Sequence, residues 1–177
     1  MSTANQKLGY LEYCQLAEDG NVHEIMDGDH YMNPPPSPYH QAILGNLHFQ
    51  LYAQVKSKGL GQVFVAPTDV QLSAHDIVQP DIVVILNERQ DIVTPSRIVG
   101  SPNLVVEILS DSTASRDKQL KMQLYRRSCI PEYWLVDAKA KRVTQLVFQA
   151  NDYVEFGRYS RRAFFSCTTW KGFCQLP

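Results

Sequence analysis

The chain of 177 residues lacks the features that mark several specialised classes of protein. Its four cysteines form no C-x-x-C pair, which disfavours a zinc site or a disulfide framework and favours reduced thiols in a cytoplasmic protein. No charged-then-apolar leader opens the sequence, and no apolar run is long enough to cross a bilayer. No membrane association is therefore expected.

Charge is also scarce. Charged residues make up 20% of the chain, and the formal net charge is -1. A hydrophobic content of 44% is typical of a globular protein, and the length predicts one domain over residues 1–177 with a core of its own. Because there is no global basic field, any binding of nucleic acid would need a local patch.

The stretch from Pro80 to Asp137 holds the strongest pattern in the chain. Apolar runs without alternation predict strands over Ile82–Leu86 and Asn103–Leu109, covered on both faces by helices. A helical pattern over Ala114–Ser128 follows, and then another strand over Pro131–Asp137.

Three charged residues in this stretch are not explained by a core. Asp81 and Glu107 lie beside or within the predicted strands, where a charge costs several kcal/mol unless a partner or a metal compensates it. Lys121 falls on the apolar arc of its predicted helix, with Leu120 and Leu124, and should face the sheet. The alternative is that its ammonium reaches the rim along an extended side chain.

The rest of the chain is predicted as a succession of short elements. The patterns predict helices over Asn5–Ala17 and Tyr39–Lys58, strands over Val22–Met26, Tyr31–Met32, Gln62–Ala66, Thr68–Leu72, Arg142–Gln149 and Tyr153–Phe156, a proline-rich connector over Asn33–Pro38, and a polar loop over Ser73–Gln79.

Two N-terminal residues are further candidates. Glu24 shares a strand face with Val22 and Met26, so it either lines an inner cleft or lies in water on an edge strand. His40 follows the prolines in the first turn of a predicted helix. A surface histidine is the favoured interpretation, and a place in the same cleft, in contact with a phosphate, is the alternative.

The acids suggest metal chemistry. Asp81 begins one strand and Glu107 ends the next, so their carboxylates should converge at one edge of the sheet. With the backbone carbonyl of Ile108 they can hold a hard divalent cation, Mg²⁺ or Mn²⁺, which activates a bound water and neutralises charge on a phosphoryl group. The amine of Lys121, expected within hydrogen-bonding or one-water reach of Glu107, can orient that water or stabilise the transition state.

Several motifs together resemble the Uma2 family, also called DUF820, whose members are restriction-endonuclease-like proteins abundant in cyanobacteria. The motifs are Pro80-Asp81, Val106-Glu107-Ile108-Leu109-Ser110, Asp117…Lys121…Tyr125, Glu132-Tyr133-Trp134-Leu135-Val136-Asp137 and, near the N-terminus, His23–Gly28 followed by Pro35-Pro36-Ser37 and His40. The resemblance extends from the first helix to about Glu155.

This family is similar to the PD-(D/E)XK nuclease superfamily. The resemblance implies an α/β (α+β) fold with a mixed central β-sheet flanked by helices, a restriction-endonuclease-like core with an N-terminal helix and β-hairpin. It also implies Mg²⁺-dependent cleavage of DNA phosphodiester bonds, with Asp81 and Glu107 as metal ligands.

The sequence departs from the superfamily pattern at one position. The lysine expected two residues after the second acid is replaced by Leu109, so Lys121 on the next helix would have to supply the cation. The accessory candidates are Glu24, His40, Asp117 and Tyr125.

Three functions are compatible with these observations. The first is an active metal-dependent DNA endonuclease, often a homodimer when both strands are cut. The second is a catalytically silent nuclease fold that acts as a binding module, and the third is a metal-dependent phosphoryl hydrolase with a smaller substrate. The low net charge favours the second and third, whereas the two acids and the lysine favour the first.

Overall fold

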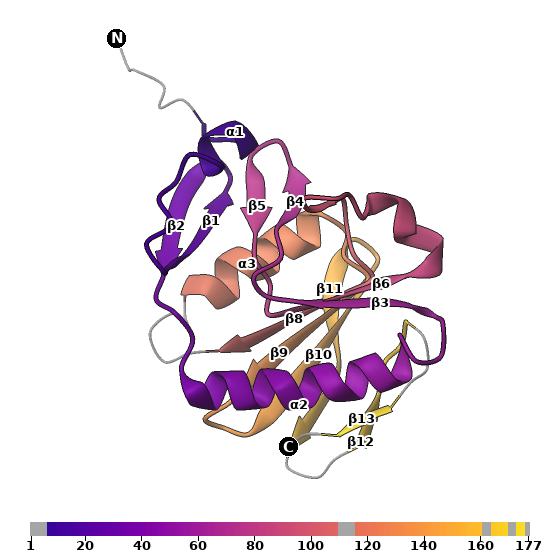
Figure 1. The fold of residues 1–177 in the computed structure, drawn as a ribbon. Helices are drawn as coiled ribbons and strands as arrows, with labels where there is room; N and C mark the ends of the chain where they lie inside the picture. The colour runs from indigo at the N-terminus through magenta and orange to yellow at the C-terminus, as the bar shows by residue number, and fades with distance from the viewer. Residues whose placement is uncertain (1–6, 110–115, 161–163, 170–172, 176–177) are drawn as a thin grey trace.

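The computed structural model describes residues 7–109, 116–160, 164–169 and 173–175, with the backbone alone for residues 116–118, 164–166 and 173–175. These residues form an α+β fold with two mixed β-sheets and few helices (Figure 1). The helices are α1 (Tyr10–Tyr13), α2 (Pro38–Gln54), the 3₁₀ helix η1 (Asn87–Ile92) and α3 (Arg116–Arg127).

The larger sheet has six strands in the order β11-β10-β9-β8-β6-β3. Its members are β3 (Gly61–Val65), β6 (Ile82–Leu86), β8 (Leu104–Leu109), β9 (Glu132–Asp137), β10 (Arg142–Gln149) and β11 (Asp152–Ser160). β8 and β9 are parallel, and α3 connects them, because parallel neighbours need a crossover connection. The other neighbouring pairs are antiparallel.

The smaller sheet has five strands in the order β2-β1-β5-β4-β7. Its members are β1 (Val22–Met26), β2 (Asp29–Asn33), β4 (Val70–Ser73), β5 (Asp76–Val78) and β7 (Ile98–Val99). A two-stranded ribbon of β12 (Phe164–Ser166) and β13 (Phe173–Gln175) lies near the C-terminal end.

Both faces of the larger sheet are covered, as the unbroken apolar strands predict. α2 crosses one face, and α3 lies on the other together with residues of the smaller sheet (Figure 1). On the α2 side the core contains Leu47, Leu51, Val84, Val106 and Trp134, and on the α3 side it contains Val78, Val83, Val105, Leu124 and Tyr133.

The start of α2 is fixed by local chemistry. Ser37 is the N-cap and accepts a hydrogen bond from the backbone N–H of His40 at 3.2 Å, while Pro38 occupies the first turn. The helix buries Ile43, Leu44, Leu47 and Leu51 against the sheet. This cap determines where His40 stands relative to the end of β8.

The structure corrects four predictions about elements. The expected loop Ser73–Gln79 contains β5, which pairs with both β1 and β4 in the middle of the smaller sheet. The first helix is confined to Tyr10–Tyr13 within the described part of the expected range, and the second ends at Gln54, before Lys58. β11 continues to Ser160, well beyond Phe156.

Among the described residues, no helix has both the length and the apolar character that a membrane crossing requires. Cys14, Cys129 and Cys167 are free thiols, as expected, and Cys174 lies outside the described side chains.

Candidate active site

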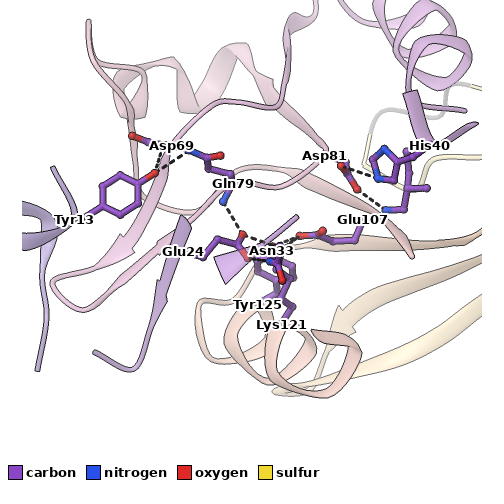
Figure 2. Close-up of polar contacts among 11 residues, drawn as sticks. Tyr13, Glu24, Asn33, His40, Asp69, Gln79, Asp81, Glu107, Lys121 and Tyr125 are labelled. Atoms are coloured by element: carbon purple, nitrogen blue, oxygen red, sulfur yellow. Dashed lines mark hydrogen bonds and ion pairs between the residues drawn. The ribbon is translucent and has the colours of Figure 1, made fainter. Parts of the chain in front are cut away.

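Asp81 and Glu107 meet where β6 and β8 pair. The antiparallel register sets Ile82 opposite Val106. Continued by one residue, it sets Asp81 opposite Glu107, so the two side chains lie together at the end of this strand pair (Figure 2). The alternation of side chains along β8 turns Glu107 to the same face as Val105, the face that α3 covers.

Two side chains of α3 bind Glu107 there. The ammonium of Lys121 lies 2.9 Å from Glu107 Oε1, and the hydroxyl of Tyr125 donates to the same oxygen at 2.5 Å. Lys121 and Tyr125 are four residues apart, which places them on one face of the helix. The predicted reach of Lys121 to Glu107 is confirmed, and the alternative of a lysine at the rim is wrong, since Lys121 is 6% exposed.

Glu24 is the second acid beside Lys121. Its Oε1 lies 2.9 Å from the ammonium, and the side chain is fully buried. The same oxygen accepts a hydrogen bond from the backbone N–H of Gln79 at 2.9 Å, and Oε2 accepts one from Asn33 Nδ2 at 3.3 Å. The inner-face interpretation of Glu24 is therefore confirmed, because β1 lies between β2 and β5 and not at an edge.

His40 and the backbone of Ile108 bind Asp81. Asp81 Oδ1 lies 3.2 Å from His40 Nε2, and Oδ2 accepts a hydrogen bond from the N–H of Ile108 at 2.7 Å. The Nδ1 atom of His40 is buried, and no described residue pairs with it. The surface interpretation of His40 is wrong, because its side chain is 12% exposed and lies against Asp81.

These groups line one cleft of about 970 Å³. The residues that line it include Glu24, Asn33, His40, Gln79, Asp81, Glu107, Ile108, Leu109 and Lys121. The cleft thus brings together the predicted residues from β1, α2, β6, β8 and α3. Tyr125 reaches it through its hydrogen bond to Glu107. Asp117 lies in α3, but its side chain is outside the described residues.

Burial and neighbouring charges shift the pKa values of Glu107 and Lys121. Desolvation, together with the negative charges of Asp81 and Glu24, raises the pKa of Glu107 to about 7, although the charge of Lys121 lowers it. For Lys121, burial lowers the pKa, but the negative charges of Glu107 and Glu24 outweigh burial and raise it above its ordinary value. The ammonium is therefore held in its charged form.

The hydrogen bond to Asp81 raises the pKa of His40, although burial opposes this shift. The negative charge of Asp81 and the backbone carbonyl of Ile108 act in the same direction as the hydrogen bond. His40 thus favours its charged form beside the carboxylate.

The chain is similar to known proteins in sequence and in fold. A family model described as "Uma2: Putative restriction endonuclease" matches residues 10–165. The chain belongs to the Uma2 family. A crystal structure of "a putative nuclease belonging to DUF820" from Anabaena variabilis ATCC 29413 has the same fold, with a TM-score of 0.76 over 93% of this chain and 91% of that chain at 19% identity. No curated protein matches the chain.

The residues around Asp81 and Glu107 fit a hard divalent cation. Among the described residues, both donors to Glu107 bind Oε1, which leaves Oε2 for a cation beside Asp81 and the Ile108 carbonyl. No three His, Cys, Asp or Glu side chains of the described residues are grouped to hold a metal alone. Two carboxylates suffice for Mg²⁺, because this ion keeps several waters and binds substrate phosphates.

Two residues of the candidate site were not predicted from the sequence. Asn33 and the backbone of Gln79 both bind Glu24. Gln79 could have been found from the sequence, since it stands two residues before Asp81 in the segment that leads into β6. No pattern in its own segment indicates Asn33, because its position beside Glu24 depends on the register that pairs it with Val22.

Proposed function

We propose that this protein is an endonuclease that hydrolyses DNA phosphodiester bonds with Mg²⁺ or Mn²⁺ bound between Asp81 and Glu107. The observation that carries the proposal is the buried ammonium of Lys121, 2.9 Å from Glu107, in the cleft that also contains Asp81. Perturbed ionisable groups that converge in a cleft are typical of catalytic sites.

Each residue has a role in the proposal. The carboxylates of Asp81 and Glu107, with the Ile108 carbonyl, would hold the cation. When bound, the cation supplies a water of lowered pKa and neutralises the charge of the phosphodiester. Lys121 holds a proton at Nζ, orients the attacking water by a hydrogen bond, and stabilises charge that develops on the phosphorus oxygens.

The other residues position these groups. Tyr125 fixes the Glu107 carboxylate, and His40 fixes that of Asp81. Glu24 holds the ammonium of Lys121 from the opposite side, and could join the metal shell. Hydrogen-bonded partners of this kind orient ligands and raise metal affinity.

The charge of the cleft supports metal dependence. Its acids are Glu18, Glu24, Asp81 and Glu107, whereas its lysines are Lys121 and Lys139. A phosphodiester would meet more carboxylates than cations there, so a bound divalent ion is needed to admit it. We further propose that the reaction takes place in the cytoplasm, where the free thiols stay reduced, and that a homodimer cuts both strands.

The volume of the cleft favours a second candidate. At about 970 Å³ it is within the range of small-molecule sites, so a metal-dependent hydrolase of a smaller phosphodiester is the alternative. Hydrolysis of bis(p-nitrophenyl) phosphate without any cleavage of plasmid DNA would favour this alternative.

Nicking of supercoiled plasmid tests the proposal. We expect the wild-type protein to convert supercoiled to open-circular DNA in Mg²⁺ or Mn²⁺ and not in EDTA. Asp81→Asn should lose roughly 100-fold or more of this rate, because it weakens the metal site. Asp91→Asn, the same change at an exposed acid of η1, is the matched control and should keep the rate. Equal rates for both variants would reject the site.

A further inference from the structure

A second hollow of about 380 Å³ adjoins the cleft. Pro67 and Gln79 line both, so the two spaces meet at these residues. Gln79 contacts both spaces. Its backbone N–H binds Glu24 in the cleft, and its side chain, which lines the hollow, is directed towards Asp69 and Tyr13 (Figure 2). A ligand in the hollow would therefore lie next to a chain segment bound at the acids.

Hydrogen bonds fix the polar groups of the hollow. Gln79 Nε2 donates to Asp69 Oδ1 at 2.9 Å and to the hydroxyl of Tyr13 at 2.8 Å, and that hydroxyl donates to Asp69 Oδ1 at 2.6 Å. A carboxylate can only accept, so the amide nitrogen of Gln79 must face Asp69. Among the described residues, Asp69 Oδ2 and Gln79 Oε1 have no donor, and both remain as acceptors for a ligand.

Two of the three hydroxyls that line the hollow already donate hydrogen bonds, whereas Ser96 Oγ accepts one from Arg97 Nη1 at 3.3 Å. Thr68 Oγ1 donates to the carbonyl of Val65 at 2.7 Å, and Thr94 Oγ1 donates to the carbonyl of Arg97 at 2.5 Å. The lining combines five apolar residues with six polar ones, and the apolar residues are Phe64, Pro67, Val93, Pro95 and Ile98. Open acceptors between apolar side chains match a planar ligand that has apolar faces and carries N–H groups at its rim.

Arg97 adds one cation to this lining. Its guanidinium lies 3.7 Å from the centre of the Tyr10 ring, and its Nε donates to Gln71 Oε1 at 2.8 Å. These contacts hold a positive charge beside the hollow. A nucleotide has the matching chemistry, since its base can donate N–H groups and its phosphate is an anion.

We propose that the hollow binds one unpaired nucleobase with an exocyclic amino group, and that Asp69 determines this specificity. The inference rests on the proposed function, because the base belongs to the DNA strand bound in the cleft. Carboxylates accept hydrogen bonds from the amino group of cytosine, whereas thymine offers a carbonyl oxygen at the same position. Cytosine and adenine therefore fit the hollow, and the carboxylate repels thymine.

Binding of short single strands in EDTA tests the proposal apart from metal and cleavage. Fluorescence anisotropy with labelled dC6, dA6 and dT6 should show dC6 and dA6 bound on the order of tenfold more tightly than dT6. Asp69→Asn keeps one oxygen for Tyr13 and Gln79 and turns an NH₂ group towards the hollow. This variant should therefore abolish the preference or reverse it towards dT6.

The control variant is Asp91→Asn, which removes the same charge from an exposed position and should retain the preference. Thermal unfolding shows that each variant is folded. Equal affinities of the wild-type protein for the three strands, an unchanged preference in Asp69→Asn, or no binding of any strand would overturn the proposal. Plasmid nicking tests the proposed nuclease function separately. An enzyme that nicks plasmid but shows no base preference would contradict the proposed base site and leave the nuclease proposal intact.

Discussion

The ammonium of Lys121 lies 2.9 Å from Glu107 Oε1, although the two residues belong to different elements and are 14 positions apart. Taking both charges out of water costs several kcal/mol per ion, and their attraction only partly repays that cost. Such a pair is a poor source of stability. The ammonium nevertheless lies between two buried carboxylates, those of Glu107 and Glu24, as the proposed role in chemistry requires.

Metal binding should stabilise the folded chain. A ligand that binds only the native state at 100 times its Kd adds about 2.7 kcal/mol, which corresponds to a Tm shift of about 5–10 °C for a chain of this size. We expect Mn²⁺ to produce such a shift in the wild-type protein and in Asp91→Asn. In Asp81→Asn and Glu107→Gln the shift should vanish, and a shift of the same size in all four proteins would contradict the site.

His40 should tune the affinity for metal through Asp81. Removing a partner that orients a metal ligand typically costs 10- to 100-fold in affinity. Calorimetric titration with Mn²⁺ should therefore give about tenfold or greater weakening in His40→Gln. His48→Gln changes a histidine of the same helix that packs on the Tyr52 ring, and it should bind metal like the wild-type protein. Equal weakening in both variants would indicate a general effect on α2.

The acids and the lysine of the site could be predicted because local patterns determine them. Continuous apolar runs identify β6 and β8, and the helical period places Lys121 on the arc that faces the sheet. The burial of Glu24 was not predictable, because it depends on Gln79, a residue 55 positions away. The same holds for His40, whose partner Asp81 lies on another element.

The strand β5 illustrates another limit of sequence patterns. It has three residues and begins with the acid Asp76, which favours a loop. The carboxylate is nevertheless buried, since it accepts a hydrogen bond from the N–H of Asp27 at 2.8 Å and one from Ser73 Oγ at 2.6 Å, and it pairs with Arg127. Asp27 and Arg127 come from distant segments, so no local pattern reveals them as partners.

Stability should depend on pH through Glu107. Its pKa is raised to about 7 in the folded protein, so the folded state holds a proton that the unfolded state has already released. The stabilisation is present below the ordinary pKa of a glutamate and is lost as the pH rises through about 7. Urea unfolding in EDTA should show the free energy of unfolding of the wild type falling relative to Glu107→Gln between about pH 5 and pH 8. A constant difference would contradict the raised pKa.

Glu132 should be a main determinant of stability outside the cleft. It is fully buried, Trp134 Nε1 donates to Oε1 at 2.6 Å, and the hydroxyls of Thr168 and Thr169 donate to Oε2 at 2.6 and 2.7 Å. In Glu132→Gln the new NH₂ group cannot accept the hydrogen bonds of these donors, which should lower the free energy of unfolding by about 3 kcal/mol. Urea unfolding measures the loss, and the exposed Glu155→Gln should change stability by less than about 0.5 kcal/mol.

Plasmid nicking by Lys121→Met, measured beside Mn²⁺ calorimetry on the same protein, tests the central claim most directly. Methionine keeps the length of the side chain and removes its charge, and Lys56→Met makes the same change at an exposed position. We expect Lys121→Met to lose about 100-fold or more of the Mg²⁺-dependent rate while Mn²⁺ binding is nearly retained, because the ammonium stabilises the transition state and is not a ligand. Lys56→Met should cleave like the wild type. Full cleavage by Lys121→Met, or no cleavage by the wild-type protein, would contradict the account.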